Sequence, residues 1–371
     1  MQDDIYMLWL SSLVHQVGSR KLNFLLGEYK SARAIFNAHF KELQELLVGA
    51  PQTFEYIVAN RNLYNIEAML ETMQNEGIAY IARCNPRYPT LLAEIPDPPI
   101  GIFFIGTLPP DNTEKIAIIG SRKGSEYGKL TARILAQPLA EAGVVVVSGM
   151  ARGVDSVTHS GALQGGGPTI AVLGCGVDIC YPAENKLLRQ DIINNGCVLS
   201  EYAPGVRPAP AFFPARNRII SGLCRAVVVT EASEKSGTLI TVDQAHEQGR
   251  EVFAVPGNIS SKLSYGTNQL IREGAYPVSS HEDILSVLGI TPQIARKFVG
   301  QKAELNVSSL APDEKQVYDN LSQEPASIDI LADVTGIEIG KLHLICTKFE
   351  LNGLAKKLPG ARFIRNGNGA K

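Results

Sequence analysis

Cysteine pairs, long apolar runs and an excess of one charge are all missing from this 371-residue sequence. The six cysteines form no C-x-x-C pair and have no zinc-ligand spacing, so we read them as buried free thiols in a reducing cytosol. The start, Gln2-Asp3-Asp4, is acidic where a signal peptide is basic. No apolar run approaches the roughly 18 residues of a membrane helix. These absences predict a cytoplasmic protein without membrane insertion.

The charge balance and the missing motifs exclude several common sites. Lys and Arg number 35 against 37 Asp and Glu, so a polyanion site would have to be a local patch. The sequence has no Walker A loop. No carboxylate cluster has metal-ligand spacing, which argues against a metal-dependent nuclease. We therefore predict neither a cofactor nor a metal ion.

The spacing of apolar residues changes along the chain and divides it into several regions. The first 80 residues repeat apolar side chains at helical spacing and predict a small SAM- or helix-hairpin-helix-like domain. A Rossmann-like domain, a polar linker and a basic winged-helix-like tail follow, and we place them at residues 81–290, 291–309 and 310–371. The tail could bind duplex DNA or dock a protein. Val17–Lys21 could be a phosphate-binding hairpin turn or a plain turn between helices.

The middle region alternates short β-branched runs with segments of helical length. Apolar runs of this kind are buried on both faces, which indicates a parallel sheet between helices. Right-handed crossovers then give a doubly wound, mostly parallel α/β fold. The expected strands are Ile102–Gly106, Ile116–Ile119, Val144–Val147, Thr169–Leu173, Val198–Leu199, Ala226–Thr230 and Val252–Val255.

The loop after the first parallel strand is suited to an anion rather than to NAD. Its glycines, Gly120, Gly124 and Gly128, have the spacing G-x-x-x-G-x-x-x-G instead of G-x-G-x-x-G. The second strand runs into Ser148-Gly149, where a dinucleotide site would place an acid. What remains is a helix N-terminus flanked by basic residues, which is an anion site by geometry. The alternative is an ordinary strand–helix turn with solvated basic residues.

A second signal is the absence of acids between Tyr202 and Thr230. This stretch contains four arginines and the sequence Phe212-Phe213-Pro214 just before Arg216. Arginine beside an aromatic ring is how proteins bind single-stranded nucleic acid without reading its sequence. The alternative is that the phenylalanines are core residues and the arginines are structural. His159 is more consistent with a hydrogen-bonded core residue than with a catalyst, and Asp155 could cap the helix that it begins.

The loops, taken in order, resemble those of the DprA/Smf family of bacterial DNA-processing proteins. The similarity is dense over the middle region and looser at both ends. The matching motifs are Gly120-Ser121-Arg122, Ser148-Gly149-x-Ala151-Arg152-Gly153-x-Asp155, Tyr181-Pro182, Leu199-Ser200-Glu201, Phe213-Pro214-x-Arg216-Asn217-Arg218, Glu231-Ala232, Ser236-Gly237-Thr238, Pro256-Gly257 and Gly266-Thr267-Asn268.

This resemblance implies a non-enzymatic protein that binds single-stranded DNA, protects incoming strands and loads the recombinase RecA onto them during natural transformation. It also implies a homodimer formed through the Rossmann-like domain. The positions expected to bind single-stranded DNA are Ser121, Arg122, Arg152, Phe213, Arg216, Asn217, Arg218 and Lys235. The family usually has asparagine where this chain has Phe212, and Pro138 should kink the first crossover helix.

The alternative function is an enzyme of the related phosphoribohydrolase type. Those proteins carry a Pro-Gly-Gly-x-Gly-Thr loop near a catalytic glutamate. The corresponding place here, Glu234–Thr238, lacks the double glycine, although Glu231 could supply the acid. Release of free base from AMP would distinguish this alternative from a binding protein.

Overall fold

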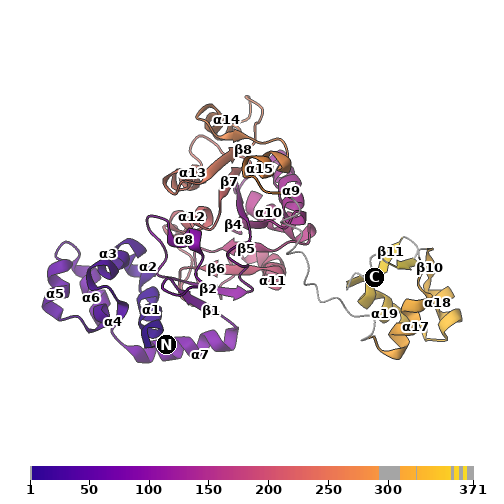
Figure 1. Ribbon diagram of the computed structural model, residues 1–371, viewed down its shortest axis with the longest axis horizontal. Coiled ribbons are helices and arrows are strands. Elements are labelled where there is room, and N and C mark those ends of the chain that lie inside the picture. The colour runs from indigo at the N-terminus through magenta and orange to yellow at the C-terminus, as the bar shows by residue number, and fades with distance from the viewer. Residues whose placement is uncertain (1, 292–309, 323, 352–354, 359–361, 366–371) are drawn as a thin grey trace. The chain divides into compact units, whose positions relative to one another are not determined.

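The computed structural model describes residues 2–291, 310–322, 324–351, 355–358 and 362–365 (Figure 1). The chain divides into two compact units, Met1–Gly300 and Gln301–Lys371. Within these ranges, the first unit holds the N-terminal helices and a nine-stranded sheet, and the second holds three helices and a three-stranded sheet. No helix of these described ranges is both long and apolar enough to cross a membrane.

The N-terminal helices pack around a fully buried Trp9. Gly18 joins the second helix to the third with a φ of 82°, a backbone conformation that favours glycine. The apolar cluster of these helices continues into the first two strands through Ala82 and Phe103. The helices are α1 (Gln2–Ser12), α2 (Val14–Val17), α3 (Ser19–Tyr29), α4 (Ala32–Asn37), α5 (Phe40–Leu46), α6 (Pro51–Ala59) and α7 (Leu63–Glu76).

The sheet has the order β1-β2-β6-β5-β4-β3-β7-β8-β9. From β6 to β9 all neighbours are parallel, while β2 runs antiparallel to both β1 and β6. The inner strands β3–β7 are buried along their whole length, as a sheet covered on both faces requires. The strands are β1 (Ala79–Ala82), β2 (Gly101–Gly106), β3 (Lys115–Ile119), β4 (Val145–Ser148), β5 (Thr169–Val172), β6 (Cys197–Ser200), β7 (Ala226–Val229), β8 (Glu251–Ala254) and β9 (Tyr276–Pro277).

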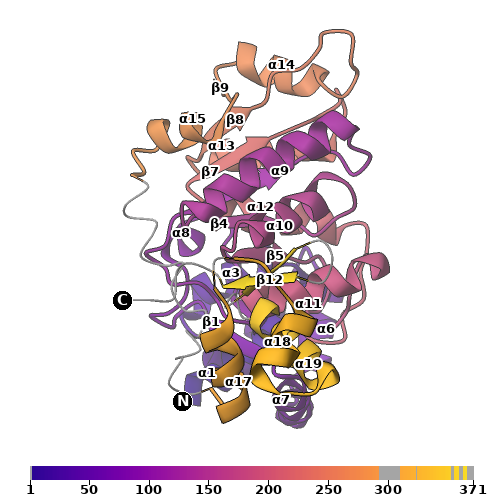
Figure 2. The ribbon, with the colours of Figure 1, turned by 90° about the vertical axis from the view of Figure 1, so that its right-hand side faces the viewer.

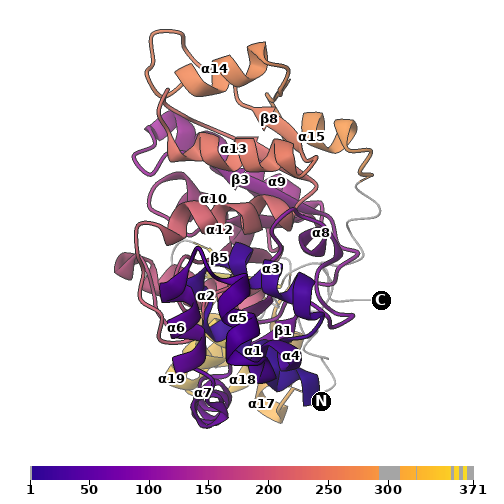
Figure 3. The same ribbon diagram turned by 90° about the vertical axis from the view of Figure 1, so that its left-hand side faces the viewer.

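Helices cover both faces of this sheet, so the predicted doubly wound, mostly parallel fold is confirmed. Figure 2 shows the face with α9 (Glu126–Glu141), α10 (Val154–Gln164) and α11 (Lys186–Asn195). Figure 3 shows the opposite face, with α12 (Phe212–Gly222) and α13 (Gly237–Glu247). The helix α9 extends through Pro138 to Glu141. The remaining short elements are α8 (Thr90–Ala93), η1 (Ala183–Asn185), α14 (Tyr265–Arg272) and α15 (His281–Val287).

The strand order creates a topological switch point between β3 and β7. The chain leaves β3 toward β4, β5 and β6, and then returns to β7 on the other side of β3. In open α/β sheets, ligands bind in the crevice beyond the carboxyl ends of the strands at such a point. The loops that begin at Gly120 and Thr230 therefore flank the expected binding crevice.

The second unit is a winged helix with its own apolar core, which includes Leu331 and Phe349. Its order of helix, strand, two helices and two strands matches the compact tail expected from the sequence. Lys341 pairs with Asp313, and the guanidinium of Arg365 lies 4.6 Å from the centre of the Tyr318 ring. The elements are α17 (Pro312–Asn320), β10 (Ala326–Ser327), α18 (Ile328–Thr335), α19 (Ile339–Leu351), β11 (Ala355–Leu358) and β12 (Arg362–Arg365).

Candidate nucleic-acid interface

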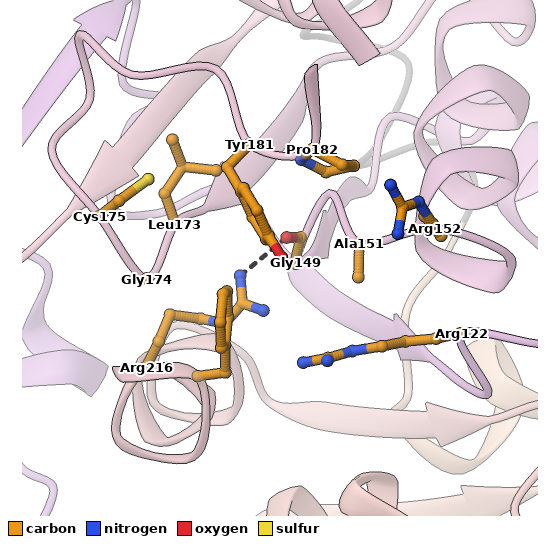
Figure 4. Close-up of a pocket in the computed structure, with 11 residues that line it drawn as sticks. Arg122, Gly149, Ala151, Arg152, Leu173, Gly174, Cys175, Tyr181, Pro182 and Arg216 are labelled. Atoms are coloured by element: carbon orange, nitrogen blue, oxygen red, sulfur yellow. Dashed lines mark hydrogen bonds between the residues drawn. The ribbon is translucent and has the colours of Figure 1, made fainter. Parts of the chain in front are cut away.

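A crevice of about 750 Å³ lies at the switch point. It is bounded by the loops that follow β3, β4 and β7 and by the first turns of α12 and α13. A smaller pocket, drawn in Figure 4, shares the Arg122 side of this crevice. Five of the eight predicted contact residues line the crevice, namely Ser121, Arg122, Phe213, Arg216 and Asn217.

Arg122 and Phe213 form the central pair of the crevice. The guanidinium carbon of Arg122 lies 5.0 Å from the centre of the Phe213 ring, within the range of a cation–π interaction. Arg122 follows β3 and Phe213 begins α12, so the pair bridges two walls. Because the face of the ring attracts the guanidinium without neutralising its charge, Arg122 keeps its hydrogen-bond donors for a ligand anion.

Tyr181 extends the aromatic surface beside Phe213. The two ring centres are 5.5 Å apart with an interplanar angle of 33°. Tyr181 is 43% exposed, so part of its ring can accept a further planar group. In the sequence Tyr181 appears only within a motif, and its contact with Phe213 was not predicted. The signal that could have found it is an aromatic residue in the loop beyond a parallel strand, beside glycines that let the ligand approach.

Phe212 faces away from the crevice, although it is next to Phe213 in the chain. Its ring stacks on Tyr202 at 4.4 Å, and it packs against the apolar cluster of the N-terminal helices. Successive residues of a helix point about 100° apart, so α12 separates the two rings. Phe212 therefore packs within the protein, and Phe213 is the ring that lines the crevice.

Arg216 forms the buried floor of the pocket. Its side chain donates hydrogen bonds to the backbone carbonyls of Gly149, at 2.8 Å, and of Val172. Burial lowers the pKa of Arg216 to about 10, and the nearby Asp155 carboxylate opposes this shift. The guanidinium thus stays charged at neutral pH. In Figure 4, Arg216 and Arg122 enter the pocket from opposite sides.

Two buried titratable groups lie below Arg216. Burial raises the pKa of Asp155, and the charge of Arg216 partly offsets that rise. Asp155 lies in the first turn of α10 and accepts a hydrogen bond from the Ala151 N–H, while Gly153 takes the N-cap position expected for Asp155. His159 shares a 2.7 Å hydrogen bond with Thr169, and burial lowers its pKa to about 3. It is a neutral core residue.

The start of α9 is already occupied by a protein carboxylate, which corrects the expectation of free N–H groups there. Glu231 is buried and accepts hydrogen bonds from both the backbone N–H and the hydroxyl of Ser125, the N-cap residue. The negative charge complements the positive end of the helix dipole. A ligand anion would instead meet the side chains of Arg122 and Lys123, which line the crevice. The two hydrogen bonds from Ser125 also occupy Glu231, the residue that would be the catalytic acid if the chain were a phosphoribohydrolase.

The other three predicted residues lie elsewhere. Arg218 is buried and donates to both carboxylate oxygens of Glu201, at 2.7 and 2.6 Å, so its charge is used within the protein. Arg152 lines the smaller pocket but is paired with Glu184. Lys235 is exposed in the loop after β7 and does not line the crevice, although the adjacent Ser236 does.

Gly128 is required for the contact between α9 and Glu231. A Cβ built at this position would lie 2.2 Å from the Glu231 Oε2 atom. We expect Gly128→Ala to lower the free energy of unfolding by about 1–3 kcal/mol, because either the carboxylate or the helix must move. Gly27→Ala is the matched control, since a Cβ there meets nothing within 4 Å and alanine favours the helix. Equal stability of both variants in urea unfolding would contradict this expectation.

The described residues contain no group of three or more His, Cys, Asp and Glu side chains that could hold a metal ion. The binding features of the crevice are instead guanidinium groups, aromatic rings and small polar residues at a topological switch point. Together with the winged-helix unit, they define a Rossmann-like protein whose switch-point crevice is lined by cationic and aromatic side chains.

Comparison with known proteins then identifies the family. Residues 79–289 match the family model described as DNA recombination-mediator protein A, and residues 301–361 match the DprA winged helix domain. The chain belongs to the DprA/Smf family. Protein Smf of Synechocystis is 33% identical over 96% of this chain and 98% of its own length. DNA processing protein DprA of Streptococcus pneumoniae is 49% identical over 54% of this chain and 70% of its own.

Two solved structures are also similar. The X-ray structure of DNA processing protein A from Streptococcus pneumoniae has a TM-score of 0.65 at 37% identity, covering 77% of this chain and 97% of its own. DNA processing protein A from Helicobacter pylori has a TM-score of 0.51 at 32% identity, covering 57% of this chain and 95% of its own. The latter structure was described for its single-stranded DNA binding mode.

Proposed function

We propose that this chain binds single-stranded DNA in the switch-point crevice and acts as a DNA-processing accessory protein in natural transformation. The observation that carries the proposal is the pairing of Arg122 with Phe213 at the mouth of the crevice. A cation beside an accessible ring suits a polymer of alternating phosphates and bases. Family membership and the single-stranded DNA binding mode described for the Helicobacter pylori relative support it.

Binding would depend on phosphates and ring stacking rather than on base identity. Arg122 would neutralise a phosphate, and Phe213 with Tyr181 would stack on bases, which every nucleotide can satisfy. Lys235, at the rim, would add to the electrostatic attraction. Titration of a fluorescent oligothymidine, with duplex DNA as competitor, tests the proposal. A preference for the duplex would contradict it.

The remaining partners are proposed from the family. We propose that the chain protects incoming single strands, loads a RecA-type recombinase onto them, and works in the cytoplasm as a non-enzymatic homodimer. The name of the matching family, recombination mediator, supports the recombinase step. An apolar stripe on α9, where Leu130 and Ile134 are each more than half exposed, supports a protein interface on the Rossmann-like domain. Sedimentation tests the homodimer, and a recombinase filament assay tests the loading step.

The neighbouring phenylalanines should respond differently to truncation. We expect Phe213→Ala to weaken oligothymidine binding by about 5- to 100-fold, because one stacked base is worth about 1–3 kcal/mol. Phe212→Ala should leave binding nearly unchanged and instead lower the melting temperature, because its ring packs on Tyr202. Fluorescence anisotropy and thermal unfolding of both variants measure the two effects. Unchanged affinity in Phe213→Ala would remove the proposed stacking role.

A further inference from the structure

The surface of the N-terminal helices has its own combination of cations and an exposed aromatic ring. A hollow of about 300 Å³ between α3 and α5 is lined by Arg20, Lys21 and Phe24, together with apolar residues that follow Leu46. The Phe24 side chain is 50% exposed. In the described part of the chain, neither Arg20 nor Lys21 has an ion-pair partner, and the Lys21 ammonium donates only to the Thr53 hydroxyl.

The two hollows of this small domain differ in the charge of their linings. A second hollow, on α7, is lined by Glu67 and Glu71 around Leu70 and includes no cation. The hollow at α3 includes no acid. The α3 hollow therefore has the chemistry of a polyanion site with a stacking ring.

The basic hollow lies along a short succession of depressions that begins at the switch-point crevice. Pro210 and Phe213 line the crevice, while the two residues between them, Ala211 and Phe212, line the next depression. That depression is closed on its other side by Gly18 and Ser19, and the following two residues of α3 line the basic hollow.

The start of α3 is held firmly against the Rossmann-like part of the unit. Ser19 and Asn23 donate to the two carboxylate oxygens of Asp97, at 2.7 and 2.8 Å. Arg218, on α12, donates to the Ser19 hydroxyl at 3.1 Å and to the Asp97 carbonyl at 2.9 Å. These bonds fix the basic hollow relative to the helix that carries Phe213. A strand could therefore engage both places without ordering a mobile domain.

We propose that the N-terminal helices carry a second contact for the same DNA strand, in which Arg20 and Lys21 neutralise phosphates and Phe24 stacks on a base. This inference rests on the proposed function of the crevice and lengthens its footprint. The turn at Gly18 is not the phosphate ligand, because its N–H bonds to the Val14 carbonyl. The side chains one turn further along α3 take that role. Strand length then determines how many contacts a ligand can make.

The test compares oligothymidines of about 6 and about 25 nucleotides, because single modules cover roughly 4–16 nucleotides. The full chain and the double variant Arg20→Ala/Lys21→Ala are titrated with both lengths. We expect the double variant to bind the long strand about tenfold more weakly and the short strand as the wild type does. The log–log salt slope for the long strand should become about 1.4 less steep in the double variant, because each of the two lost phosphate contacts contributes roughly 0.7.

Matched controls separate this contact from general effects. Lys41→Ala removes an exposed cation of the same domain outside the hollow, and Leu70→Ala truncates an exposed apolar residue beside the acidic hollow. Neither should change long-strand binding, whereas Phe24→Ala should weaken it about 5-fold or more. Unchanged long-strand affinity in the double variant, or an equal loss at both lengths, overturns the inference. Binding of an acidic peptide instead of DNA by the hollow would overturn it too.

The same titrations distinguish failure of the second contact from failure of the crevice proposal. Short-strand binding depends on the crevice alone, so it is the control for that proposal. If Arg122→Ala leaves short-strand binding intact, the crevice proposal fails. If Arg122→Ala weakens short-strand binding while the Arg20/Lys21 variant behaves as the wild type at both lengths, only the second contact fails.

Discussion

Replacing Arg122 by alanine should weaken oligothymidine binding by about 10- to 100-fold at moderate salt. A hydrogen bond to a charged group is worth about 1.5–3 kcal/mol, and 1.4 kcal/mol corresponds to a tenfold change in affinity. Arg122 is the crevice arginine whose guanidinium is not engaged by backbone carbonyls, unlike that of Arg216. The loss should therefore appear mainly in binding and only slightly in the free energy of unfolding.

Salt dependence gives this prediction a second readout. Each phosphate neutralised on a single strand contributes a log–log slope of roughly −0.7, so the slope for Arg122→Ala should become about 0.7 less steep. Arg225→Ala is the matched control, because Arg225 precedes β7, at the opposite end of the strand from the crevice, and is paired with Glu114. Arg225→Ala should keep the wild-type affinity and slope. An unchanged slope in Arg122→Ala would contradict the proposed phosphate contact.

Replacing Glu201 by alanine should lower the free energy of unfolding by about 3–5 kcal/mol, because the buried charge of Arg218 loses its bidentate partner and keeps only the longer contact with Asp97. Glu201 is 2% exposed and accepts two hydrogen bonds from Arg218. Burial acts to lower the pKa of Arg218, but the charge and hydrogen bonds of Glu201, together with the charge of Asp97, raise that pKa overall. Because arginine stays protonated even without a partner, Arg218 keeps its charge when Glu201 is removed. At about 2–4 °C per kcal/mol, the melting temperature should fall by roughly 6–20 °C.

A double variant distinguishes loss of the ion pair from loss of packing. Glu201→Leu/Arg218→Met replaces both charges by apolar side chains of similar size, and such exchanges are often neutral or stabilising. Differential scanning calorimetry should therefore show the double variant to be more stable than Glu201→Ala. If both variants melted together, the cost would lie in packing rather than in an unpaired charge. Short-strand binding by the folded double variant should remain, since Arg218 does not line the crevice.

The sheet could be predicted from the sequence wherever burial is complete. The strands β3 to β8 lie within about one residue of the expected runs, because buried parallel strands are continuous stretches of β-branched residues. The edge strand β1, Ala79–Ala82, was missed, since its four residues directly follow a helical pattern. The two-residue β9 carries too little sequence to be recognised.

The site was predicted in part, for a similar physical reason. Arg122 and Phe213 follow from their places at the ends of a strand and a loop, which the topology brings to one crevice. Arg216 and Arg218 look equivalent in sequence, two residues apart with no acid nearby. Their difference comes from Asp97 and Glu201, which are remote in the chain and pair with Arg218 alone. No local pattern contains that information.

The two carbonyl bonds of Arg216 also determine how the protein would carry mechanical load. A DNA strand bound as proposed would, under tension, pull on Phe213 and therefore along α12. Arg216, one turn further along that helix, connects it to the carbonyls of Gly149 and Val172, at the ends of the central strands β4 and β5. The force would then be shared by the hydrogen-bonded middle of the sheet instead of by surface loops. The DNA contact at Phe213 would then resist displacement as strongly as the central sheet itself.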